Sequence, residues 1–109
     1  MPTFNYPDDF KTAQSNLQQK PVTIASATTV TPVSKLTFLT GTAQLTNLTP
    51  PVQGAYCEVT LCFTDANPGA FLTNGTVNPI KTAYTPIQNR PIDLCYDPLS
   101  NFWWVKAVV

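Results

Sequence analysis

The sequence predicts an all-β domain, a small antiparallel sandwich or barrel, preceded by an extended arm and a short helix. Three observations support this fold class. The chain of 109 residues is rich in threonine and other β-branched residues, and it contains 11 prolines but no histidine. About seven short β-prone runs follow one another at close spacing, each bounded by turn-forming residues. A chain of this length forms a single domain.

Residues 1–21 differ from the rest of the chain and are predicted to form an N-terminal region distinct from the β domain of residues 22–109. The region begins with an extended arm, Met1–Tyr6, which carries two aromatic side chains, Phe4 and Tyr6. Terminal residues of this kind usually fray. Because the two aromatics have little to pack against in so small a domain, we expect the arm to dock on a neighbouring molecule.

A short helix is predicted between the arm and the β domain. In residues 7–20, Thr12 is the only β-branched residue. Asp8 can cap the first helical turn, and Pro21 stops the helix. Four residues fall on one helical face and give it a thin apolar stripe: Phe10, Ala13, Gln14 and Leu17.

From residue 22 onward the pattern favours strands. The first two β-prone regions are Val22–Val30 and Lys35–Leu48, and the second is either two strands or one long strand with a bulge at Gly41. Tyr56–Thr64 is the clearest strand, since apolar residues alternate along it. Ala70–Thr73 is expected to form a further short strand.

The chain is expected to end in a hairpin. Its strands are Ile92–Tyr96 and Phe102–Val109, and residues 97–101 form the turn. Adjacent residues of a strand face opposite sides, so we place Trp103 in the core and Trp104 on the surface.

Three residues of the last strand are candidates for a contact between subunits: Phe102, Trp104 and Val108. Strict alternation puts them on the same face, and tryptophan is common at the energetic centre of interfaces. The alternative is that Trp104 binds a ligand.

Charged residues are scarce in this chain. They make up 11% of it, against about 25% in typical soluble domains, and Leu36–Cys57 contains none. We therefore expect much of the surface to be covered by copies of the chain or by a larger assembly. The net charge is zero and the six basic residues are scattered, which argues against nucleic-acid binding. No signal peptide is expected, because the start of the chain lacks a basic region and an apolar run. No membrane span is expected, because the uncharged stretch from Leu36 is broken by glycine and proline.

The sequence offers no catalytic, cofactor-binding or metal site. The lack of histidine excludes a Ser-His-Asp or Cys-His arrangement. Cys57, Cys62 and Cys95 lack the spacing of zinc ligands, and we interpret them as buried free thiols. Two carboxylates can hydrolyse glycosides, but Asp93 lies within a predicted strand and Asp97 opens a turn, so we do not expect them to form a catalytic pair. The chain is therefore not expected to be an enzyme.

The segment Leu36–Pro51, with Thr-Gly-Thr-Ala at its centre, resembles a strand-and-turn motif of small β domains in tailed-bacteriophage virion proteins. In those domains an apolar strand follows the proline, as Val59–Phe63 does here. They often close on a hairpin with a Tyr-Asp turn and a tryptophan pair, which Tyr96-Asp97 and Trp103-Trp104 match. Pro98 stands where that family usually has glycine, which lengthens the turn.

This resemblance implies a structural role in the virion, commonly as a homotrimer. Such domains occur in head decoration proteins, head fibres and tail-fibre tips. Because the chain is short, we expect a capsid decoration (cement) protein that binds the major capsid protein on the capsid surface after synthesis in the host cytoplasm. The capsid-anchor candidates are Phe4, Tyr6, Phe10 and Leu17. The alternative is a head-fibre or tail-fibre tip that binds a host receptor or glycan.

Overall fold

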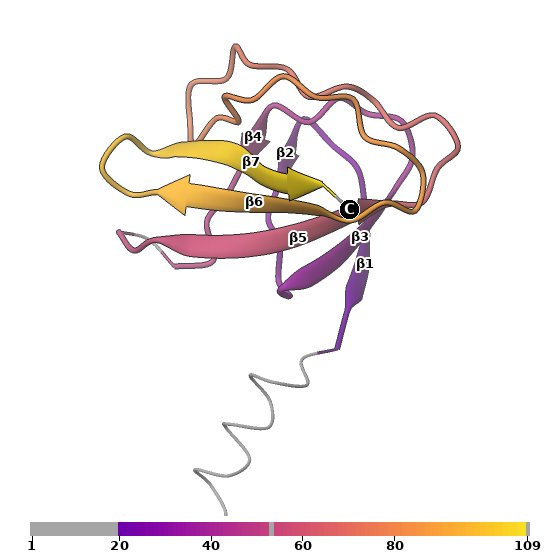
Figure 1. The fold of residues 1–109 in the computed structure, drawn as a ribbon, viewed down its shortest axis with the longest axis horizontal. Coiled ribbons are helices and arrows are strands. Elements are labelled where there is room, and N and C mark those ends of the chain that lie inside the picture. Colours follow the sequence, from indigo (N-terminus) through magenta and orange to yellow (C-terminus); the bar gives the residue numbers. More distant parts are fainter. Residues whose placement is uncertain (1–19, 53, 109) are drawn as a thin grey trace, which may run out of the picture.

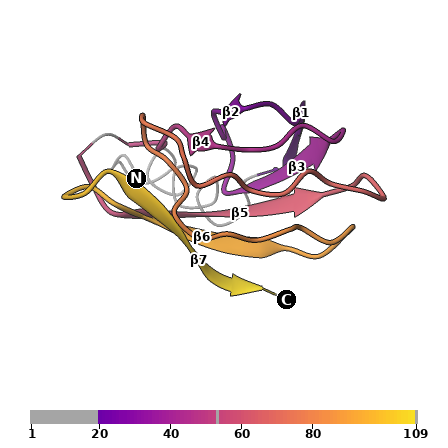
Figure 2. The same cartoon turned by 90° about the horizontal axis from the view of Figure 1, so that it is seen from above.

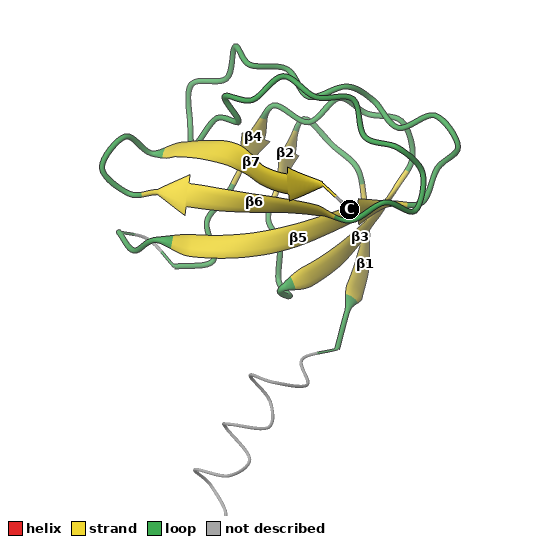
Figure 3. Ribbon diagram, in the orientation of Figure 1, coloured by secondary structure: helices red, strands yellow, loops and turns green. Residues whose placement is uncertain are grey.

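The computed structural model describes residues 20–52 and 54–108. The predicted arm and helix therefore lie outside the described residues, except for Lys20 and Pro21. The described part is all-β, as predicted, and contains no helix (Figure 3). Its strands are β1 (Val22–Ala25), β2 (Thr29–Val30), β3 (Leu36–Thr40), β4 (Asn47–Leu48), β5 (Cys57–Phe63), β6 (Ile92–Asp97) and β7 (Phe102–Val108).

The strands form two sheets (Figure 1). The larger sheet has five strands in the order β1-β3-β5-β6-β7, and the smaller one pairs β2 with β4. Figure 2 shows the smaller sheet and the long loops on one side of β5, β6 and β7. The larger sheet therefore has a covered face and an opposite face, which we call the open face. On the open face the side chains of β5 and β6 are half-buried, apart from the buried Cys62.

The predicted antiparallel arrangement is wrong for half of the larger sheet, which is mixed and does not close into a barrel. β1 pairs with β3, and β3 with β5, in parallel, whereas β5, β6 and β7 pair in antiparallel fashion. The reason lies in the connections. The chain alternates between the sheets from β1 to β5, so successive strands of each sheet run in the same direction. Parallel strands need such crossover connections, and tight hairpins cannot provide them.

The core fills the space between the covered face and the smaller layer. Alternation along β5 and β6 directs apolar side chains to this face, and the loops add Phe71 and Ile80. The buried cluster is Val30, Leu39, Leu45, Leu48, Val59, Leu61, Phe63, Phe71, Ile80, Ile92, Leu94, Tyr96 and Trp103.

Trp103 lies in the core, as predicted. Its side chain is fully buried, and its ring centroid is 5.1 Å from that of Tyr96. Its indole Nε1 donates a hydrogen bond of 2.6 Å to the backbone carbonyl of Leu48 in β4. Trp103 thus joins the larger sheet to the smaller one, and its polar atom has a partner despite complete burial.

The final hairpin also forms as predicted, and Asp97 opens its turn. One carboxylate oxygen of Asp97 accepts a hydrogen bond from the Leu99 amide at 2.9 Å, and the other accepts one from the Ser100 hydroxyl at 2.9 Å. Asn101 completes the turn at a φ of 62°, a left-handed conformation that asparagine tolerates well. These contacts give Asp97 a structural role.

Other predicted strands differ from the structure. Val22–Val30 divides into β1 and β2, which lie in different sheets, and Gly41 at a φ of 86° ends β3. Of residues 42–48, only Asn47–Leu48 form a strand. Ala70–Thr73 is not a strand, because its backbone bonds to loops: the Phe71 amide donates to Tyr84 and the Leu72 amide to Leu45.

Candidate interaction surface

Three neighbouring strands place aromatic and charged side chains together on the open face. Glu58 of β5 pairs with Cys95 of β6, and Cys95 pairs with Trp104 of β7. Paired residues lie on the same face of a sheet, so these three side chains form one row across the strands. We call this row and its neighbours the aromatic platform, which comprises Tyr56, Glu58, Cys95, Phe102, Trp104 and Lys106.

The aromatic rings of the platform remain accessible. Trp104 is 37% exposed and Tyr56 is 58% exposed. The rings of Phe102 and Trp104 meet edge to face, with centroids 6.0 Å apart and planes at 78°, an arrangement that aromatic pairs favour. The Lys81 ammonium lies 5.0 Å from the Phe102 ring centroid, so a cation also borders the platform.

A carboxylate with two donors forms the polar part of the platform. Glu58 Oε2 accepts hydrogen bonds from the Tyr56 hydroxyl at 2.6 Å and from Lys106 Nζ at 2.8 Å. These bonds, that of Lys106 above all, hold the pKa of the Glu58 carboxyl below its ordinary value. The same contacts raise the pKa of the Lys106 ammonium and, chiefly through the bond to Glu58, that of Tyr56 to about 12. All three groups therefore keep their ordinary protonation states near neutral pH.

Two of the three predicted subunit-contact residues, Phe102 and Trp104, belong to the platform. Val108 does not share their face as alternation predicts. A β-bulge lies between β6 and β7, because Leu94 pairs with Val105 but Asp93 pairs with Ala107. The extra residue shifts the alternation and sets Val108 opposite Ile92, which faces the core. Val108 is 43% exposed at the end of β7.

Four platform residues were not among the predicted site residues: Tyr56, Glu58, Cys95 and Lys106. Alternation along β5 already placed Tyr56 and Glu58 on one face, and that signal was present in the sequence. The pairings of β5 with β6 and of β6 with β7 were not, and these pairings bring residues of β5 into one row with Trp104.

The three cysteines are free, as predicted, but only Cys62 is buried, whereas Cys57 and Cys95 are half-buried. Cys57 shares the core-facing register of Val59, and Cys62 lies on the open face. Burial raises the pKa of the Cys57 and Cys62 thiols, so both are poor nucleophiles near neutral pH.

The carboxylates of Asp93 and Asp97 both make structural hydrogen bonds. Asp93 Oδ1 accepts a hydrogen bond of 2.7 Å from the hydroxyl of Thr60 on the neighbouring strand, and Asp97 stabilises the hairpin turn. Within residues 20–52 and 54–108, no group of three or more histidine, cysteine, aspartate or glutamate side chains is placed to hold a metal ion. None of the described residues form a helix long and apolar enough to cross a membrane.

The capsid-anchor candidates Phe4, Tyr6, Phe10 and Leu17 lie outside the described residues. Comparison of the chain with protein-family models, with curated proteins and with solved structures finds no match. Any functional conclusion therefore rests on the residues themselves.

Proposed function

We propose that the chain is a structural protein of a bacteriophage virion, a capsid decoration protein that binds the head shell as a homotrimer. Two features of the sequence support this proposal: the resemblance of residues 36–109 to small virion β domains, and the charged fraction of 11%. A surface this poor in charge is better suited to an assembly than to an isolated domain.

The observation that carries the proposal is the accessible aromatic platform on the open face. Trp104 is exposed and packs edge to face against Phe102, and Tyr56 is exposed on the same face. Aromatic residues are enriched where protein interfaces are fully buried. In a trimeric ring each subunit uses two different surfaces, one toward each neighbour. We propose the platform as one of these two surfaces.

Two measurements test this function. Light scattering on the purified full chain should give the mass of a trimer at micromolar concentration, and a monomer would contradict the proposal. Images of phage heads incubated with the protein should show added density on the shell, and deletion of residues 1–20 should abolish that density while leaving the trimer intact.

A second candidate is a fibre tip that binds a glycan, and the polar part of the platform favours it. Glu58 shares the open face with the Trp104 ring and binds Lys106 and the Tyr56 hydroxyl, so a sugar could stack on the ring while hydrogen-bonding to these groups. If Trp104→Ala leaves the trimer intact and abolishes binding to cells or glycans, this function replaces decoration.

A further inference from the structure

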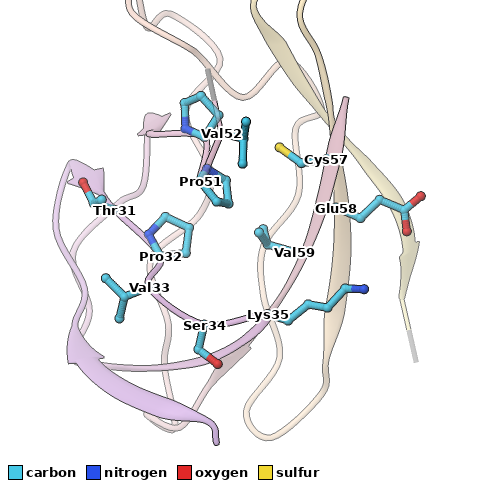
Figure 4. Close-up of a pocket in the computed structure, with 11 residues that line it drawn as sticks. Thr31, Pro32, Val33, Ser34, Lys35, Pro51, Val52, Cys57, Glu58 and Val59 are labelled. Carbon is cyan, nitrogen blue, oxygen red and sulfur yellow. The ribbon is translucent and has the colours of Figure 1, made fainter. Parts of the chain in front are cut away.

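A groove of about 790 Å³ lies at one end of the larger sheet (Figure 4). Residues 31–35 and 50–52 form two of its walls, and the start of β5 forms the third. Figure 4 shows Cys57 and Val59 of β5 pointing toward Pro32 and Pro51 on the facing segments. The groove borders the aromatic platform and shares one residue with it, Glu58.

The walls of the groove suit apolar side chains. Pro32, Pro50 and Pro51 line it, and proline has no amide hydrogen to donate and a ring that fixes the backbone. Val33 and Val52 also line the groove and are 63% and 56% exposed. Thr31, Lys35 and Glu58 add polar groups to the lining, and an apolar segment of polypeptide would bury the exposed valines.

The N-terminal region joins the domain at the border of this groove. Ser34, a buried lining residue, donates a hydrogen bond of 2.8 Å from its hydroxyl to the backbone carbonyl of Lys20. The chain that precedes Lys20 therefore starts beside the groove. Leu17 is three residues earlier, and three residues of extended chain reach about 10 Å.

We propose that the groove is the docking site for residues 10–19 of the same chain, with the apolar side chains of Phe10 and Leu17 as its occupants. The short connection to Lys20 favours this segment over an untethered polypeptide. Tethering by a short linker gives the segment an effective concentration on the order of millimolar. Docking fixes the base of the N-terminal region on the domain and leaves Phe4 and Tyr6 to reach a partner. The inference does not rest on the proposed virion function, since groove and segment belong to one chain.

Disulfide trapping in the full chain tests the proposal, because the native Cys57 already lines the groove. Leu17→Cys should form a disulfide with Cys57 in oxidised glutathione at alkaline pH, where the thiols ionise, and peptide mass spectrometry of the unreduced protein identifies the pair. Ser15→Cys is the matched control, since residue 15 lies outside the predicted apolar stripe. We expect the Leu17→Cys disulfide to form about tenfold faster than that of Ser15→Cys, as proximity would dictate, and to disappear when Cys57 is replaced by serine.

A second set of variants tests the groove itself. Val52→Asp in the Leu17→Cys chain should slow the disulfide about tenfold by placing a charge among apolar partners. Val77→Asp is the control, because Val77 is 67% exposed and does not line the groove. A disulfide that joins two chains would overturn the proposal in favour of a neighbour's segment. Equal rates for Leu17→Cys and Ser15→Cys, or no disulfide at all, would also overturn it.

Discussion

The two faces of the larger sheet differ sharply, and adjacent residues of β7 show how. Trp103 on the covered face is fully buried and hydrogen-bonded through Nε1 to Leu48. Trp104 on the open face is 37% exposed and contacts Phe102 edge to face. The same residue type therefore holds the two layers together at one position and offers a contact surface at the next.

Polar residues follow the same division. On the covered face, the hydroxyl of the fully buried Thr37 donates to the Ser34 carbonyl at 3.0 Å. On the open face, the hydroxyl of the half-buried Thr60 donates to the Asp93 carboxylate. Solvent can replace a lost partner on the open face but not on the covered one. Substitutions on the covered face should therefore change stability, and those on the open face should change association.

The largest expected effect is that of Trp103→Ala. Removing this ring leaves a cavity between the two layers, and loss of a buried tryptophan costs about 3–5 kcal/mol of unfolding free energy. Chemical denaturation measures this loss. Trp103→Phe should cost less, because it fills part of the space and loses only the Nε1 hydrogen bond. A loss below about 1 kcal/mol for the alanine variant would contradict the central role of Trp103.

Trp104→Ala should leave the fold of each subunit almost unchanged and weaken the trimer. Truncation of an aromatic side chain at an interface centre costs about 2 kcal/mol or more of association free energy. Sedimentation over a range of protein concentrations measures this cost. Leu99→Ala is the control, since Leu99 is 94% exposed in the hairpin turn and is not a platform residue. If both variants form trimers as tightly as the parent chain does, the platform is not part of the interface.

A matched pair of threonine variants compares the two faces directly. Thr37→Val leaves the buried Ser34 carbonyl without its side-chain donor and should cost about 1–3 kcal/mol, the penalty for an unsatisfied buried group. Thr60→Val should cost about 0.5 kcal/mol or less, since water can reach Asp93. Denaturation of both variants under the same conditions gives the comparison. If both variants lose the same free energy of unfolding, water is excluded from the open face as fully as from the covered face.

The smallest effect concerns pH and the platform. Because the folded-state pKa of Glu58 is lowered by Lys106 and Tyr56, its contribution to stability is complete above the unfolded-state pKa and is lost as the pH falls through the folded-state value. The effect on stability is small because the side chains of Lys106 and Glu58 are 52% and 39% exposed. NMR titration should show a low pKa for the Glu58 carboxyl, and Lys106→Met should raise it. An unchanged pKa in that variant would exclude the ion pair as its cause.

Alkaline titration tests the hydrogen bond between Tyr56 and Glu58. The pKa of Tyr56 is raised to about 12, first of all by its hydrogen bond to Glu58. This contribution to stability is present below the ordinary tyrosine pKa of about 10 and is lost as the pH rises through the folded-state value. The absorbance difference between the parent chain and Tyr56→Phe isolates this tyrosine. Glu58→Gln should lower its pKa toward the ordinary value.

Local features of the sequence determined the all-β class, the final hairpin and the opposite placement of the two tryptophans. Alternation of apolar residues indicates which side chains share a face of a strand, and it therefore predicted that Trp103 is buried. The Asp97 turn was equally local, because aspartate bonds to the backbone two residues onward. Such features depend on neighbours in the sequence and can be predicted without the fold.

The tertiary structure alone decided which strands pair and in which direction. The turn residues around Pro32 and Pro50 indicated breaks, but not that the chain crosses to a second layer and returns parallel to itself. Pairing also brought Glu58 into one row with Cys95 and Trp104, and the bulge in β7 moved Val108 to the other register. The physical reason is that alternation specifies faces within a strand, whereas partners and bulges are set by packing between distant segments.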